Sequence, residues 1–146
     1  MRRLQSFDAS YYDFQDAVGR TLLVWGGANV VAGAAAQASG NPFLKQFGMQ
    51  ALVWGAIDAA LALLGLRGAA KKRAERSDQT VQARRFRLIV ALNALLDVGY
   101  IAGGVALARN GRNERAGMGI GVIVQGAFLL LFDLALVALS GHWARR

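Results

Sequence analysis

The stretch VWGAIDAALALLGL, residues 53–66, forms most of an apolar segment over residues 43–66. Lys45 and Asp58 are the only charged residues of that segment. A helix crosses the hydrocarbon core of a bilayer with roughly 20 apolar residues, so this segment is long enough to span a membrane. Similar segments occupy residues 17–38, 86–108 and 116–140. The sequence therefore predicts an all-α, four-helix transmembrane bundle.

The composition fits a single integral membrane domain over residues 1–146. Hydrophobic residues make up 55% of the chain and charged residues 18%, whereas soluble domains average about 25% charged residues. The 18 glycines are typical of membrane helices, in which small residues let backbones approach one another. With no Cys and one His, a thiolate or His-rich metal site is excluded, and we expect no metal or other cofactor.

The 17 Lys and Arg residues are unequally divided between the two sides of the predicted bundle. The side with both termini and the basic segment 67–87 carries thirteen of them: Arg2, Arg3, Arg20, Arg67, Lys71, Lys72, Arg73, Arg76, Arg84, Arg85, Arg87, Arg145 and Arg146. The other side carries four: Lys45, Arg109, Arg112 and Arg115. The positive-inside rule then places both termini in the cytoplasm. This division accounts for the net charge of +8 without nucleic acid, and segment 67–87 is expected to contact anionic lipid headgroups.

The residues before the first span alternate acidic and aromatic side chains. Phe7, Tyr11 and Phe14 fall at helical spacing, which predicts a short amphipathic helix over about residues 5–16, lying at the membrane interface with its aromatic rings at headgroup depth. The alternative is a frayed polar lead-in. His142, beside Trp143 at the end of the last span, is expected at the same interface.

Polar side chains recur within all four spans, at the midplane or in the cytoplasmic half. They share helix faces with glycine and alanine, which is typical of helix–helix contacts rather than of lipid-facing surfaces. We expect them to form one polar centre: Asn29, Asp58, Asn93, Asp97, Tyr100, Gln125 and Asp133. No Lys or Arg lies at that depth. Because a charged Asp at mid-membrane costs at least about 2.5 kcal/mol, the carboxyls are either protonated or share a cation.

Two interpretations of this centre remain open. Ionisable residues inside membranes commonly serve binding or proton relay, which favours an intramembrane site. Alternatively, a protonated Asp hydrogen-bonded to an amide acts as glue between helices, which stabilises by about 0.6 to 2 kcal/mol. Trp25 and Trp54 lie too deep for an interfacial belt, so they either pack beside glycine or line a pocket.

A short repeat relates the first two spans. WGGAN (residues 25–29) and WGAID (residues 54–58) share the pattern Trp-Gly-x-x-Asn/Asp. Since the two helices are antiparallel, the repeat relates them by a pseudo-two-fold axis in the membrane plane, and transporter sites often lie at such repeat interfaces.

The segments WGGAN (25–29), LNALLDVGY (92–100) and QGAFLLLFD (125–133) resemble an uncharacterised family of small bacterial integral membrane proteins with four spans. The resemblance covers about residues 20–139. It implies a multi-pass protein of the bacterial inner membrane and carries no established activity. Position 58 is more usually Asn in that pattern, so Asp58 departs from it.

These observations predict a small membrane protein that binds or transports a proton, small cation or small polar solute. Asp58 and Asp97 would exchange the proton or hold the cation, and Asn29 and Asn93 would orient them. The alternative is a membrane scaffold or partner subunit without catalysis. An enzyme is not expected, because no nucleophile with a base, metal site or phosphate loop is present. A homodimer is compatible with the narrow path of a single bundle.

Overall fold

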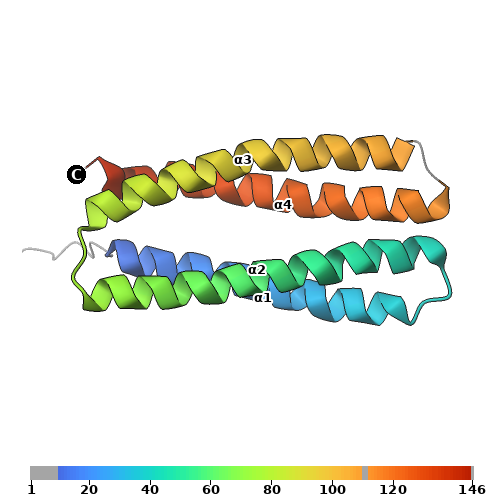
Figure 1. Ribbon diagram of the computed structural model, residues 1–146, viewed down its shortest axis with the longest axis horizontal. Coiled ribbons are helices and arrows are strands. Elements are labelled where there is room, and N and C mark those ends of the chain that lie inside the picture. The colour runs from blue at the N-terminus through green and yellow to red at the C-terminus, as the bar shows by residue number, and fades with distance from the viewer. Residues whose placement is uncertain (1–9, 110–111, 146) are drawn as a thin grey trace, which may run out of the picture.

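The computed structural model describes residues 10–109 and 112–145, which form four long helices. The helices are α1 (Tyr11–Gln37), α2 (Pro42–Ala74), α3 (Gln79–Arg109) and α4 (Asn113–Ala144). They form two antiparallel hairpins, α1/α2 and α3/α4, which lie side by side (Figure 1). The part of the chain so described contains no strand, which confirms the predicted all-α, four-helix architecture.

Three helices, α2, α3 and α4, are long and apolar enough to cross a membrane. The predicted first span, residues 17–38, lies almost wholly in α1 (Tyr11–Gln37), which is not among these three helices. Arg20, Asn29 and the many small residues of α1 dilute its apolar character. A membrane protein with three clear spans is therefore supported by length and composition, while α1 is a helix of mixed character packed along α2.

Side-chain caps and short connections set the helix boundaries. Ser10 and Asp13 form a capping box at the start of α1, in which each side chain accepts the other residue's backbone N–H. Asn41 Oδ1 accepts the backbone N–H of Phe43 at 2.9 Å, with Pro42 in the first turn of α2. Asp78 Oδ1 accepts the backbone N–H of Thr80 at 2.8 Å, at the start of α3.

Glycine contacts hold each hairpin together. A Cβ atom added to Gly26 would lie 2.6 Å from the carbonyl oxygen of Gly55, and a Cβ on Gly55 would lie 2.6 Å from that of Gly26. Gly104 and Gly119 have the same reciprocal relationship between α3 and α4. These pairs let the backbones touch, as is common between membrane helices. The predicted faces of small residues are thus the contact faces of these pairs.

Large aliphatic side chains lie on the outside of the bundle. Val24, Leu95 and Leu131 are each 70% or more exposed, whereas the buried positions of α1 and α2 are mostly glycine and alanine. This is the reverse of a protein folded in water, where large apolar side chains fill the core. The pattern agrees with an apolar surrounding for the bundle.

The start of α1 differs from the predicted interfacial helix. Residues 11–16 form the first turns of α1 itself, and residues 5–9 lie outside the described residues. Tyr11 and Tyr12 are buried within the protein. Tyr12 Oη donates to the carbonyl of Ser77 at 2.9 Å, and Phe14 stacks on Trp143 with ring centroids 4.9 Å apart. The aromatic residues instead join the ends of the two hairpins.

The basic segment 67–87 is largely helical, because α2 continues to Ala74 and α3 begins at Gln79. A four-residue turn over 75–78 joins them, with Arg76 in the left-handed region at φ 52°. Arg73 contacts two carboxylates of α1, Asp13 at 3.0 Å and Asp16 at 2.9 Å. This ion-pair cluster fastens the first turns of α1 to the end of α2.

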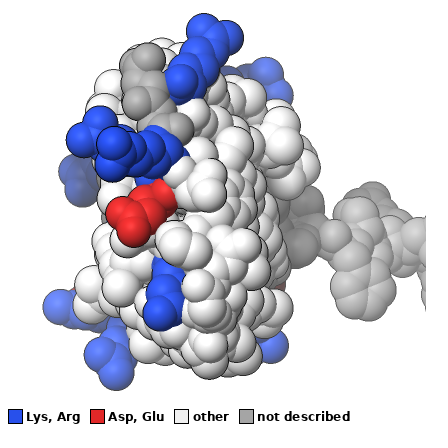
Figure 2. Space-filling model, turned by 90° about the vertical axis from the view of Figure 1, so that its right-hand side faces the viewer, with Lys and Arg blue, Asp and Glu red and all other residues white. Residues whose placement is uncertain are grey.

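Basic side chains occupy both ends of the bundle. Figure 2 looks onto the end where α2 and α4 begin, and shows them around an otherwise mostly uncharged surface. The described basic residues of that end are Lys45, Arg109, Arg112 and Arg115. The opposite end, where α1 begins and α4 ends, has more of them, among them Arg67, Lys71, Lys72, Arg73, Arg84 and Arg85. Basic residues thus lie at both ends of the bundle, and the surface between the two ends is mainly apolar.

Candidate functional site

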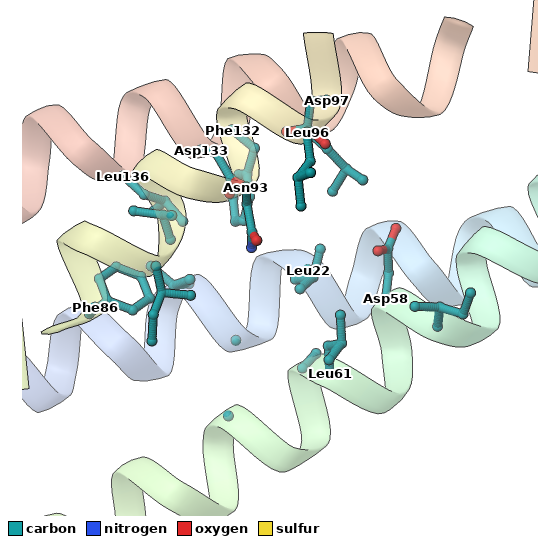
Figure 3. A pocket seen from close by; sticks show the side chains of 18 of the residues that line it. Leu22, Asp58, Leu61, Phe86, Asn93, Leu96, Asp97, Phe132, Asp133 and Leu136 are labelled. Carbon is teal, nitrogen blue, oxygen red and sulfur yellow. The ribbon is translucent and has the colours of Figure 1, made fainter. Parts of the chain in front are cut away.

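A cavity of about 400 Å³ lies between the two hairpins. All four helices contribute to its wall, and Figure 3 shows how the labelled side chains enter it. Three of its lining residues are Asp58 of α2, Asp97 of α3 and Asp133 of α4. The structure therefore brings the three predicted intramembrane carboxyls to one cavity.

The helix faces explain why these carboxyls point inward. Asp58 follows Gly55 on the buried face of α2, between Ala51 and Ala62. Once the Gly26–Gly55 contact fixes the rotation of α2 against α1, Asp58 must face the opposite hairpin, and its side chain does so in Figure 3. Asp97 lies on the buried face of α3, one turn after Ala94.

The three carboxyls are almost fully buried. Asp58 is 2% exposed, Asp97 3% and Asp133 7%. One oxygen of Asp58 (Oδ2) and one of Asp97 (Oδ2) have no hydrogen-bond partner within residues 10–109 and 112–145. All three line the same cavity. A buried acceptor without a donor is costly, so the cavity favours a proton or a positively charged guest.

No Lys or Arg is among the described residues that line the cavity. Its other polar side-chain groups are the Gln15 and Asn93 amides, the Trp54 indole N–H and the Tyr100 hydroxyl. Asn93 points into the gap between the hairpins in Figure 3. The rest of the wall is aliphatic, aromatic or glycine, so a guest would meet negative charge inside an apolar enclosure.

Two of the aromatic rings that line the cavity contact each other. Trp54 and Tyr100 meet edge to face with ring centroids 5.1 Å apart. Of the two tryptophans in the repeat, Trp54 thus lines the cavity, whereas Trp25 does not. Trp25 instead stacks on Phe128 at 3.7 Å. The tryptophan of WGAID therefore lines the cavity, whereas the tryptophan of WGGAN packs against α4.

Asn29 and Gln125 lie apart from the cavity. Gln125 Nε2 donates to Asn29 Oδ1 at 2.6 Å, and Asn29 Nδ2 donates to the carbonyl of Trp25 at 2.9 Å. Neither residue lines the cavity. The structure thus places Asn29 away from the carboxyls that it was expected to orient, with its amide bonded to Gln125 of α4 and to its own helix. The pair acts as a polar link between the hairpins.

Carboxyl geometry also limits what the cavity can hold. No group of three or more His, Cys, Asp or Glu residues in the described part of the chain is placed to bind a metal ion. Asp58, Asp97 and Asp133 thus surround a space rather than converge on a point.

The sequence interpretation missed two features. The first is the apolar part of the cavity wall, which includes Leu22, Phe86, Phe132 and Leu136. The sequence around an apolar residue does not show whether its side chain lines a cavity or packs against another helix. The second is another hollow, of about 490 Å³, beside Arg84 and Arg87. Arg84 Nε donates to the carbonyl of Ala144 at 2.9 Å, and Arg87 Nε donates to that of Val137 at 3.2 Å. The sequence feature that could have predicted this hollow is the pair Arg84 and Arg87, three residues apart at the edge of a predicted span.

Comparison with protein families gives one match. Residues 21–134 match the model of a family described as a family of unknown function, DUF6992. No curated protein and no solved structure matches the chain. The matched residues include every carboxyl of the cavity.

Proposed function

Because the chain belongs to the DUF6992 family of unknown function, we propose its function from the cavity alone. The protein is an integral membrane protein whose carboxyl-lined cavity binds a proton, a small cation or a small polar solute, for transport or for binding. The observation that carries this proposal is the burial of Asp58 and Asp97 in the cavity. Among the described residues, each has an oxygen without a hydrogen-bond partner and no Lys or Arg lines the cavity.

In the proposed arrangement all four helices cross the membrane. Support comes from α1, which packs along α2 through Gly26 and Gly33 and would cross the membrane with it. The excess of basic residues at the end where α1 begins favours a cytoplasmic location for both termini in a bacterial inner membrane. The hollow beside Arg84 and Arg87 would take anionic lipid headgroups at that surface.

Binding would proceed through the carboxyls. An ionised Asp in hydrocarbon costs at least about 2.5 kcal/mol, and a cation or proton taken into the cavity offsets that cost. Asp58 and Asp97, on opposite hairpins, would pass a proton between them or share a cation, with Asp133 as a third acceptor. The Asn93 amide and the Tyr100 hydroxyl would complete the polar contacts. In this proposal the protein is not an enzyme.

A scaffold role is the second candidate. The Asn29–Gln125 hydrogen bond between hairpins favours it. That bond joins α1 to α4, and neither residue lines the cavity. If the carboxyls were protonated and served only to hold helices, the protein would be a partner subunit or a homodimer component.

Flux measurements in liposomes separate the two candidates. Proton and Na⁺ flux would be compared for wild type, Asp58→Asn and Asp97→Asn. The matched control is Asp78→Asn, outside the cavity, because Asn caps a helix about as well as Asp. We expect flux in wild type and the control and none in Asp97→Asn. An absence of wild-type flux, with the Asn variants equally stable, favours the scaffold.

A further inference from the structure

We infer that the cavity takes a hydrophobic organic cation, that is, an amine or onium group carrying aromatic or branched aliphatic substituents. This inference rests on the proposed function, since it specifies the class of cation that the same carboxyls would hold. Three observations carry it: the size and lining of the cavity, the placement of its charges, and the side on which it opens.

The size of the cavity exceeds the need of an inorganic ion. At about 400 Å³, it falls within the range of small-molecule sites, which are mainly apolar with a few placed polar groups. A bare ion needs several oxygens within bonding distance, and the described acids do not form such a group. The aliphatic and aromatic wall, including Leu22, Phe86 and Leu136, would leave most of a hydrated ion's surface without partners.

The charges of the cavity suit a cation that is surrounded by apolar groups. Asp58 and Asp97 are nearly fully buried, each has an oxygen with no donor among the described residues, and they approach from opposite hairpins. A cationic centre between them would satisfy both. Trp54 and Tyr100, which line the cavity, offer ring surfaces to which organic cations are attracted.

The cavity opens towards the outer flank of the bundle, between α2 and α3. Its lining residues Ile57, Leu61, Ile89 and Leu96 are each 44% or more exposed, so the same side chains form the wall and the outside surface. The hairpins contact each other chiefly through α2 and α4, which leaves the α2–α3 boundary open. A membrane-embedded bundle would admit guests through that boundary from the hydrocarbon, where a lipophilic cation partitions and a hydrated ion does not.

Calorimetric binding of tetraphenylphosphonium to the purified protein in detergent tests the inference. Tetraphenylborate, which has the same shape and the opposite charge, measures non-specific apolar binding, and tetramethylammonium measures charge without large apolar groups. We expect saturable binding of tetraphenylphosphonium only, weakened about tenfold or more in Asp58→Asn and in Asp97→Asn. Tenfold corresponds to about 1.4 kcal/mol.

A steric variant keeps the test independent of the carboxyls. A Cβ on Gly65, which lines the cavity, would meet no atom within 4 Å, and the same is true of Gly103, which does not line it. Gly65→Phe should therefore abolish binding while Gly103→Phe preserves it. Equal binding by both variants, or equal binding of tetraphenylborate, would overturn the inference.

The two proposals fail in different ways. Asp97-dependent proton or Na⁺ flux without tetraphenylphosphonium binding would overturn the organic-cation inference and leave the proposed function intact. The absence of both flux and binding would overturn both proposals.

Discussion

Asp58 on α2 and Asp97 on α3 face one cavity from opposite hairpins, each with one oxygen that no hydrogen-bond donor among the described residues reaches. Folded proteins rarely leave buried polar atoms without partners, and in hydrocarbon the cost is higher than in a protein that folds in water. The pair is therefore one place where this fold gives up stability; Trp25 Nε1 and Gln125 Oε1 are the other buried side-chain atoms without a partner among the described residues. A ligand or proton that bonds to the oxygens of Asp58 and Asp97 would restore the lost stability.

Replacing either carboxyl by an amide should not weaken the fold. Asp58→Asn and Asp97→Asn remove a potential buried charge, so we expect unfolding free energies equal to wild type or up to about 2 kcal/mol higher. Thermal unfolding in detergent, followed by circular dichroism, measures this. A loss of about 2 kcal/mol or more in both variants would contradict this expectation.

The Asn29–Gln125 bond should behave as structural glue. Gln125→Leu is expected to cost about 0.6 to 1.7 kcal/mol of stability, the range found for hydrogen bonds between membrane helices, and to leave cavity binding unchanged. A double-mutant cycle with Asn29→Ala isolates the coupling between the two residues. Zero coupling would contradict the direct contact at 2.6 Å.

Neighbouring glycines of α1 should respond to a methyl group in opposite directions. A Cβ on Gly26 would lie 2.6 Å from the backbone of α2, whereas a Cβ on Gly27 meets nothing within 4 Å. We expect Gly26→Ala to destabilise the protein by about 1 to 3 kcal/mol through overpacking. Gly27→Ala should stabilise it by about 0.5 to 1 kcal/mol through helix propensity. Equal effects of the two substitutions in unfolding experiments would refute the close α1–α2 contact.

Alkaline pH should loosen the aromatic cluster at the start of α1. Burial, with the adjacent Tyr12, raises the pKa of Tyr11 above its usual value. The group therefore contributes stability below the unfolded pKa of about 10, and this contribution is lost as pH rises further, because the unfolded chain releases the proton first. Stability should fall as the pH rises above about 10 in wild type, and less steeply in Tyr11→Phe. Parallel pH profiles for the two proteins would contradict this assignment.

Much of the fold follows from sequence because period and composition are local properties. The apolar segments 43–66, 86–108 and 116–140 each lie within one helix, and the placement of Gly55 and Asp58 on one face predicted a buried carboxyl. The helices nevertheless extend beyond the apolar segments, since α2 continues to Ala74 and α3 begins at Gln79. Charged residues form helix as readily as apolar ones, so hydropathy marks the span rather than the end of the helix.

Long-range partners could not be read from the sequence. The rotation of α1 against α4 decides whether the Asn29 amide meets Gln125 or Asp58, and that rotation depends on the glycine contacts of both hairpins. The contacts of the aromatic residues in the first turns of α1 also depend on distant parts of the chain. The sequence placed these rings at lipid headgroups, whereas in the structure they pack with Phe86 and Trp143.

The most direct test of the central claim follows the protonation of the cavity carboxyls themselves. Infrared difference spectroscopy of the protein in lipid detects the carbonyl stretch of a protonated carboxylic acid. We expect such a band that changes when pH is raised or a cation is added, and that loses intensity in Asp58→Asn and in Asp97→Asn but not in Asp78→Asn. A spectrum in which no carboxylic-acid band responds to pH or to cations, or in which all three variants behave alike, would contradict it.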